Sequence, residues 1–570
     1  MEFEPMLLDT FQPATNPLGQ QWLSALLAAL PIFSMLITLG ALRWKAYMAG
    51  AFSWAVAAVV AITAFGMPVT MALATSTHGF LYGIFPIVWI LVTAIWMYEV
   101  TVHSGRFDDL RRTFFLISDD KRVLALLITF CFGGLLEALA GFGAPVAITA
   151  AMLLAIGFEP IKSALVALLA NTVPVAFGAV GLPVLMAAKT GGFEDVLDIS
   201  PITGRMTAML CLVVPFLLLL VMDGKKGLKE VWPFGLVVGI SFGITKWIVS
   251  ATPLYNLTEV FAAVVSVGVG IAFLKVWKPG GSTTATAPET SGGTPSKPAP
   301  DAGTTLTEAV TETPLTSRRI VMALVPYLLV IIVFGIAAIP PIKAVLASTD
   351  LQFAWPGLSG LLNSAGEAAA HQTYTFAWAS TPGILLALVA ILTGLIYRMP
   401  LTQIFKILWI NVKKMRFAML TIGSVVALAY VMGDSGQTLA LGLFLAGVGV
   451  AYPFFAPVLG WLGTYLTGSD TSANILFSGL QSGVGAEIGP GSHLGTDSMR
   501  ALLVGSSAAG GVVGKMISPQ SLTIAATAIG QPGSESLILR RIIGWSLVLL
   551  VLLCLISGLM STPVLSWLLP

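Results

Sequence analysis

Three charged side chains lie within stretches of this sequence that are otherwise apolar. Glu137 belongs to the run 124–140, Asp470 to a polar cluster inside a later run, and Lys515 to the segment 514–521. An ionised carboxylate in such surroundings is costly, so it usually titrates, pairs or binds a cation. Glu137 and Asp470 are therefore the candidate proton carriers. Lys515 could attract a substrate carboxylate or pair with an acid such as Asp470. A neutral, hydrogen-bonded Glu137 and a lysine that reaches the surface are the alternatives.

The segment 141–145 breaks the first of these apolar runs one helical turn after Glu137. Two glycines and a proline release backbone hydrogen bonds that lipid cannot replace, so the break must face protein or a water-filled cavity. If a helix restarts at Pro145, its free N–H groups form a small anion site. The residues of this break that we predict to bind substrate are Gly141, Phe142, Gly143 and Ala144.

A second break covers residues 468–474, with the sequence GSDTSAN. Ser469, Asp470 and Thr471 are good helix N-caps, so capping is the simpler interpretation. Capping does not explain such a polar cluster inside an apolar run, and membranes rarely carry idle polar groups. We therefore predict a substrate or ion site here. The substrate-binding candidates of this break are Ser469, Thr471, Ser472 and Asn474.

Two further polar interruptions contribute candidates. Asn171 and Thr172 precede Pro174 and can hydrogen-bond a carboxylate or hydroxyl, although helix–helix contact explains them equally well. Near Lys515, the sequence adds Ser518 and Gln520 as predicted substrate contacts. The four histidines are far apart in sequence and the three cysteines lack metal or disulfide spacing, so we expect no metal and no cofactor.

Composition identifies the solvent around these breaks as lipid. Of 570 residues, 56% are hydrophobic and 10% are charged, whereas soluble domains carry about 25% charged residues. Apolar runs of roughly twenty residues recur, and we expect about ten to fourteen membrane-inserted elements. The net charge of +2 and the lack of a basic cluster give no indication of nucleic-acid binding. The first basic residue is Arg43, so we expect no cleaved signal peptide.

Basic residues also predict the orientation. Arg106–Arg122, Lys225–Lys229 and Lys413–Arg416 are expected to form cytoplasmic loops, which places the acidic N-terminus outside. The low-complexity stretch 278–318 predicts a disordered linker between membrane halves 1–277 and 319–570.

The two halves share a motif. Residues 133–141 and 460–468 both read G-x-L-x-x-x-L-x-G. The second copy lies in a segment, 417–499, that has no Lys or Arg, so inverted repeats are favoured, with parallel repeats as the alternative. The predicted fold class is an all-α polytopic membrane protein with discontinuous helices.

At these motifs the sequence resembles the L-lactate permease family of bacterial proton-coupled carriers. The resemblance is carried by CFGGLLEALAGFGAPVAITAAML (131–153), NTVPVAFGAVGLPVL (171–185), LGWLGTYLTGSDTSANILF (459–477) and GGVVGKMISPQSLTIA (510–525). It implies proton symport of L-lactate, D-lactate or glycolate across a bacterial inner membrane, and an ion-transporter type of fold. The expected partners are thus a small 2-hydroxy acid, protons and lipid. The oligomeric state stays open, with a homodimer as one option.

Three other functions compete with this expectation. A sodium-coupled carboxylate carrier could use backbone carbonyls and Asn or Ser oxygens at the two breaks. An embedded enzyme would need a catalytic motif such as HExxH or GxSxG; HExxH does not occur, and GxSxG occurs only as GISFG (239–243), inside a long apolar run. A channel is less favoured, because two broken helices around a central site are typical of alternating access.

Overall fold

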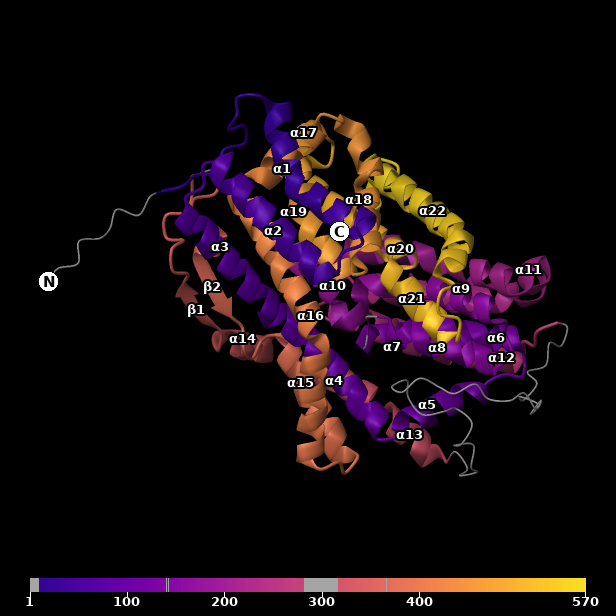
Figure 1. Cartoon of the computed structure of the whole chain (residues 1–570). Coiled ribbons are helices and arrows are strands. Elements are labelled where there is room, and N and C mark those ends of the chain that lie inside the picture. Colours follow the sequence, from indigo (N-terminus) through magenta and orange to yellow (C-terminus); the bar gives the residue numbers. More distant parts are fainter. Residues whose placement is uncertain (1–9, 140, 142, 281–315, 365) are drawn as a thin grey trace.

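The computed structural model describes residues 10–139, 141, 143–280, 316–364 and 366–570. It is mostly helical, as the sequence predicts (Figure 1). Phe142 of the first predicted break lies outside the described residues, and so do residues 281–315 of the predicted linker. Helix α13 begins at Ser317, so the last two residues of the predicted linker are helical.

The described residues of the first half form twelve α-helices, several of them shorter than a membrane span. Their bounds are α1 (Gln21–Leu36), α2 (Ala46–Thr63), α3 (Val69–Tyr82), α4 (Trp89–His103), α5 (Arg106–Phe115), α6 (Lys121–Leu126), α7 (Gly133–Leu139), α8 (Ala144–Ala155), α9 (Pro160–Ala170), α10 (Gly178–Thr190), α11 (Ser200–Val249) and α12 (Thr258–Val276). A π-helical stretch, η3 (Leu127–Phe132), joins α6 to α7.

The described residues of the second half form ten α-helices and a small sheet that the all-α prediction missed. The helices are α13 (Ser317–Ala337), α14 (Pro340–Ser348), α15 (Pro382–Ile396), α16 (Leu401–Asp434), α17 (Gln437–Ala446), α18 (Ala456–Thr467), α19 (Asp470–Ile488), α20 (Gly495–Lys515), α21 (Pro519–Ala528) and α22 (Glu535–Met560). Strands β1 (Leu351–Ala354) and β2 (Thr373–Phe376) pair antiparallel, with Leu351 opposite Phe376. The sheet belongs to the polar segment between α14 and α15.

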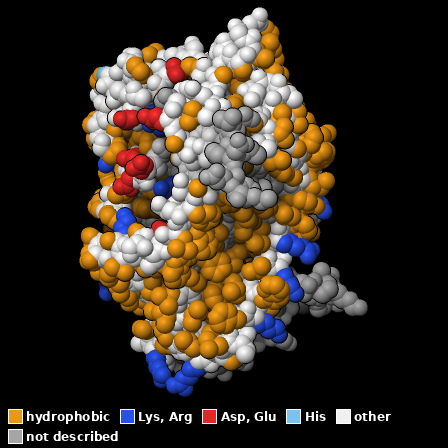
Figure 2. Space-filling view, turned by 90° about the vertical axis from the view of Figure 1, so that its left-hand side faces the viewer, with side chains coloured by type: hydrophobic (Ala, Val, Ile, Leu, Met, Phe, Trp, Pro, Cys, Tyr) orange, Lys and Arg blue, Asp and Glu red, His pale blue; other side chains and the backbone are white. Residues whose placement is uncertain are grey.

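Ten helices of the described residues are long and apolar enough to cross a membrane, or up to eleven if the bent pair Pro160–Ala170 and Val175–Thr190 forms one span. This number agrees with the lower end of the expected range. Their outer faces expose large apolar side chains, such as Trp22 and Phe33 on α1 and Val548 and Val551 on α22. Figure 2 shows a broad field of hydrophobic side chains on one face, with Lys and Arg along its lower and right-hand margins. The chain is a multi-pass membrane protein.

Helix α11 is a hairpin of two antiparallel arms. Asp223 and Gly224 leave the helical conformation, and Gly224 has a φ of +62°. In a straight helix residues 211 and 239 would be about 42 Å apart. A Cβ on Gly239 would instead lie 2.5 Å from the carbonyl oxygen of Cys211. The close approach of the arms therefore requires glycine at position 239.

The tip of this hairpin contacts the basic segment at the start of α6. Arg122 at the start of α6 pairs with Asp223 at 3.0 Å and with Glu230 at 2.6 Å, so the segments 106–122 and 225–229 share one face of the protein. Lys413 and Lys414, in contrast, lie within α16 rather than in a loop. The expectation of a basic loop there was wrong, because α16 runs without interruption for 34 residues.

Helices of the two halves pack against one another. Helix α16 runs alongside α2 and α3, α15 alongside α4, and α1 alongside α17 (Figure 1). The α3–α16 contact is close because Gly79 and Gly83 face the backbone of Ala427 and Gly423. Helices α7–α10 and α18–α21 lie on the other side of this contact and hold the predicted site residues.

Candidate functional site

Both predicted breaks interrupt helices, but each is shorter than predicted, because residues 144–145 and 470–474 are helical. Helix α7 ends at Leu139 and α8 begins at Ala144, and Gly468 and Ser469 separate α18 from α19. Gly141, Gly143 and Gly468 have φ values of +44°, +91° and +73°, a conformation that side-chain-bearing residues rarely adopt. At each break the chain folds back on itself, since a Cβ on Gly133 would contact Thr149 and a Cβ on Gly463 would contact Phe477.

Glu137 lies on α7, and its side chain is 2% exposed. Its Oε1 accepts a hydrogen bond from Lys515 Nζ at 3.2 Å, which forms an ion pair between the two halves of the chain. A Cβ on Gly178 would lie 2.9 Å from the same oxygen, so this glycine makes room for the carboxylate. The second oxygen, Oε2, is buried without a hydrogen-bond partner.

Asp470 begins α19 directly after the second break, and it too is 2% exposed. Thr464 donates a hydrogen bond to its Oδ1 at 3.3 Å, while Oδ2 is buried without a partner. A Cβ on Gly511 would overlap Oδ1. Gly511 lies one helical turn before Lys515 on α20, so the Asp470 carboxylate lies beside the Glu137–Lys515 pair. The structure thus brings together the three charged residues that the sequence analysis singled out.

Two further breaks adjoin this cluster. The segment 171–177 separates α9 from α10, and residues 516–518 separate α20 from α21. Asn171 and Thr172 are both buried; Thr172 donates to the Leu168 carbonyl, and the side-chain oxygen of Asn171 has no partner. Unpaired buried acceptors are rare and call for a donor such as a proton, a water or a substrate hydroxyl.

The start of α10 is strained. Ala179 and Val180 have φ values of +45° and +59°. A β-branched residue at positive φ is an outlier that costs of order 1–3 kcal/mol. A Cβ on Gly141 would contact Ala179, so the strained turn lies directly against the first break. Strain of this kind concentrates at functional sites.

The two sets of broken helices pack reciprocally. Helix α8, after the first break, packs on α21, and Gly143 faces Ile524 there. Helix α19, after the second break, packs on α10, where Asn474 donates to the Pro183 carbonyl at 3.0 Å. Each break is therefore completed by a helix from the other half of the chain.

The remaining predicted residues lie at the starts of α8, α19 and α21. Ser469 caps α19 through Ser472 N–H, as the capping interpretation expects, and Ser518 caps α21 through Ser521 N–H. Gln520 is exposed but contacts the second break, where a Cβ on Gly468 would lie 2.5 Å from its Oε1. Three of the others, Thr471, Ser472 and Asn474, are buried at the start of α19, and Ala144 is half-buried at the start of α8. Their contact with substrate stays a prediction.

One charge pair beside the site was missed. Lys246 on α11 and Glu259 on α12 are fully buried, with Nζ 2.5 Å from Oε1. Lys246 also donates to the carbonyl of Val173 at 2.7 Å, within the break 171–177, and lies over the ring of Phe177. The signal was present in the sequence, since each is a lone charge in an apolar run, as Glu137 is.

Comparison with known proteins identifies the family. Residues 24–564 match the family model described as L-lactate permease. The chain belongs to the L-lactate permease family. This permease is 39% identical over 543 residues to the glycolate permease GlcA of Escherichia coli (strain K12), which covers 93% of the chain and 94% of that protein. It is 36% identical to the L-lactate permease of the same organism, over 99% of the chain and 100% of that protein. Identity to the L-lactate permease of Bacillus subtilis (strain 168) is also 36%, over 97% and 98%.

As a member of this family the permease is a membrane transporter and not an enzyme. Among solved structures, the Alcanivorax borkumensis YdaH transporter aligns with 85% of the permease and 87% of its own chain, at a TM-score of 0.37 and 15% identity. That similarity is too low to support an inference about the site. The contacts described above define the arrangement of the site.

Proposed function

We propose that this permease is a proton-coupled symporter of L-lactate and related 2-hydroxy monocarboxylates, D-lactate and glycolate, across a bacterial plasma membrane. The observation that carries the proposal is the buried ion pair between Glu137, beside the first break, and Lys515, at the end of α20. The resemblance to lactate and glycolate permeases over almost the whole chain supports the substrate class.

Competition for Lys515 supplies the coupling. In the unloaded protein the Glu137 carboxylate holds the ammonium group. A proton on Glu137 removes that negative charge and frees Lys515 to bind the substrate carboxylate, which cannot enter the membrane unpaired. The helix N-termini at the two breaks add about half a positive charge each. Substrate and proton therefore bind together, because each removes the electrostatic cost of the other.

The second acid, Asp470, contributes to the net charge of the site. With both acids ionised, the cluster of Glu137, Asp470 and Lys515 carries a net charge of −1, and one proton makes it neutral. The substrate hydroxyl would be met by Thr172, Ser472 or Asn474, which can donate and accept hydrogen bonds. We assign the remaining predicted contacts to the same pocket of backbone and hydroxyl groups. These are Gly141, Phe142, Gly143, Ala144, Asn171, Ser469, Thr471, Ser518 and Gln520.

The reciprocal packing of α8 on α21 and of α19 on α10 supports two inverted repeats that move around this site. The basic segments 106–122 and 225–229, which share one face, would lie on the cytoplasmic side, with the N-terminus outside.

Uptake into proteoliposomes tests the proposal. The panel is L-lactate, D-lactate, glycolate, pyruvate and acetate, with a pH gradient as the only driving force and choline in place of Na⁺. We expect saturable accumulation of the 2-hydroxy acids, and counterflow of labelled lactate. Accumulation that requires Na⁺ would instead support the sodium-coupled alternative, in which the unpaired oxygens of Asn171 and Asp470 serve as cation ligands. Non-saturable flux without counterflow would indicate a channel.

A further inference from the structure

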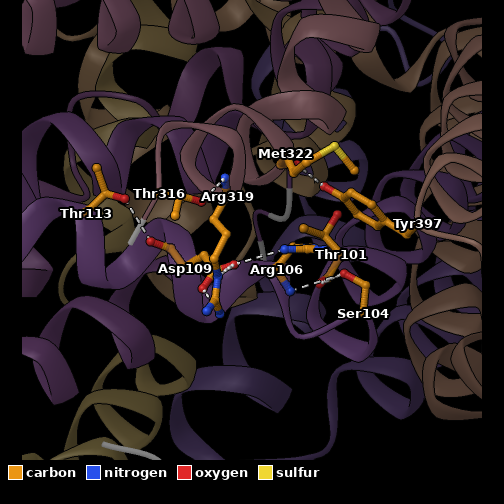
Figure 3. A network of polar contacts seen from close by, with 9 residues as sticks. All are labelled: Thr101, Ser104, Arg106, Asp109, Thr113, Thr316, Arg319, Met322 and Tyr397. Carbon is orange, nitrogen blue, oxygen red and sulfur yellow. Dashed lines mark hydrogen bonds and ion pairs between the residues drawn. The ribbon is translucent and has the colours of Figure 1, made fainter. Parts of the chain in front are cut away.

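A hollow of about 700 Å³ opens between α5 and α13, away from the transport site. Figure 3 shows the polar network beside it, in which the Asp109 side chain lies between Arg106 and Arg319. We call it the α5–α13 hollow. The residues that line it are Ser104, Gly105, Arg106, Asp109, Thr316, Arg318, Arg319 and Met322.

The lining of the α5–α13 hollow is positively charged. Arg319 binds Asp109 through Nη2 at 2.7 Å and through Nε at 3.1 Å, and Arg106 binds the same carboxylate at 3.3 Å. Asp109 is almost fully buried and thereby fixes both guanidinium groups at the edge of the hollow. Arg318 lies exposed beside them. Three arginines and one aspartate give the lining residues a net charge of +2.

Helix α13 begins in conflict with its own dipole. Arg318 and Arg319 lie in its first turn, which contains no acidic residue. Positive side chains at a helix N-terminus are unfavourable, whereas an anion there is favourable. Asp109 offsets Arg319, and Thr316 caps the helix by accepting a hydrogen bond from Arg319 N–H. Departures from local sequence preferences are typical of functional sites. An anion at this turn would interact favourably with both the helix dipole and the Arg318 guanidinium.

The position of the α5–α13 hollow indicates the source of that anion. Beyond its first turn, α13 is an apolar span whose outer face is exposed, with Val321 at 55% and Ile332 at 53%. The arginines therefore lie at the end of a lipid-facing helix, at the depth of the headgroups. Basic pockets between membrane helices bind the phosphates of anionic lipids.

We propose that the α5–α13 hollow binds the phosphate of an anionic phospholipid headgroup, with Arg106, Arg318 and Arg319 as its ligands. Through Asp109 this site connects α5 of the first half to the start of α13, the helix that opens the second half. A bound lipid would thus strengthen the contact between the two halves. The inference is independent of the proposed transport mechanism.

Native mass spectrometry of the purified full-length permease tests the proposal. The protein is stripped of lipid in detergent and titrated with phosphatidylglycerol, with phosphatidylcholine or with inorganic phosphate. We expect retention of phosphatidylglycerol in preference to phosphatidylcholine. One basic side chain near a membrane surface contributes enough that Arg318→Gln should weaken phosphatidylglycerol binding about fivefold. Lys414→Gln, which removes an exposed charge from α16, should leave it unchanged.

Arg106→Gln is the second test variant, because it removes a ligand while the stronger Arg319–Asp109 pair remains. It should weaken phosphatidylglycerol binding as well. Equal binding of the two lipids, or equal loss in Arg318→Gln and Lys414→Gln, would overturn the proposal. Displacement of phosphatidylglycerol by millimolar inorganic phosphate would overturn the lipid assignment in favour of a soluble anion.

Discussion

The ammonium group of Lys515 lies 3.2 Å from the carboxylate of Glu137, although the two residues are 378 positions apart in the chain. Glu137 lies on α7, shortly before the first break. Lys515 is the last residue of α20, directly before the segment 516–518. A movement of α7 relative to the end of α20 would therefore break or remake this pair. That relationship makes the pair a suitable element for coupling a proton to substrate movement.

If Glu137 carries the proton, Glu137→Gln should abolish lactate accumulation driven by a pH gradient. Glutamine resembles the protonated acid and leaves Lys515 available, so exchange of internal for external lactate should persist. The measurement is labelled lactate uptake and counterflow in proteoliposomes. Glu159→Gln removes a carboxylate from an exposed pair with Lys162 and serves as the control. Concentrative uptake by Glu137→Gln would transfer the role to Asp470.

Lys515→Met should strongly weaken lactate binding and destabilise the protein. Breaking a buried ion pair by removing one partner costs about 3–5 kcal/mol, since the other charge is left uncompensated. Adding Glu137→Gln should recover the lost thermal stability more fully than adding Asp470→Asn, but it should not recover lactate binding. Unfolding in detergent and a lactate binding assay measure the two quantities. Greater recovery with Asp470→Asn would make Asp470 the principal partner, and wild-type lactate affinity in Lys515→Met would exclude direct contact.

Gly511 makes room for the Asp470 carboxylate, because a Cβ at position 511 would overlap Oδ1 and lie 2.8 Å from Thr464 Oγ1. Gly511→Ala should therefore displace Asp470 and reduce transport at least tenfold, which corresponds to about 1.4 kcal/mol. Gly544→Ala is the matched control, since no atom lies within 4 Å of a Cβ there and alanine favours the helix. Initial uptake rates of the two variants provide the comparison. Equal rates would show that the site tolerates the extra methyl group.

The pair of Lys246 and Glu259 should act by positioning the break 171–177. Lys246→Met leaves Glu259 buried and uncompensated, and it also removes a donor from the Val173 carbonyl. We expect a loss of about 3–5 kcal/mol in the free energy of unfolding. The double variant Lys246→Met with Glu259→Gln should regain much of that stability, yet its KM for lactate should stay raised because Val173 remains without its donor. A wild-type KM in the double variant would assign the pair to folding alone.

His371 should make the segment between α14 and α15 sensitive to pH. Its Nδ1 lies 2.7 Å from Asp434, and it stacks on Tyr430 and faces His78. Burial lowers the pKa of His371, but the charge and hydrogen bond of Asp434 outweigh burial and raise it above 6.5. The stability it contributes is then present below pH 6.5 and lost as the pH rises through the raised pKa.

The measurement is the thermal unfolding temperature across neutral pH. The wild type should lose stability as the pH rises above about 6.5, and His371→Gln should show a smaller loss. His103→Gln, which alters a half-exposed histidine on α4, is the control. An identical pH dependence in all three proteins would contradict the assignment to His371.

The sequence by itself determined the solvent, the breaks and the polar residues at them. Each of these depends on composition or on neighbours within a few residues: lipid requires uninterrupted apolar runs, and Gly141 and Gly468 mark where those runs stop. The family also follows from the motifs around them. These features are local, so they can be predicted from the sequence without knowledge of the fold.

Only the tertiary structure decided which charges meet. Glu137 could have remained a neutral acid, and Lys515 could have reached the surface; the fold instead brings the end of α20 to Glu137 on α7, where the two side chains form an ion pair. The sequence offered Lys246 and Glu259 only as isolated charges, and their pairing depends on the turn 250–257, which folds α12 back against the second arm of α11. Side chains hundreds of residues apart are brought together by the crossing of helices, and no local pattern encodes that crossing.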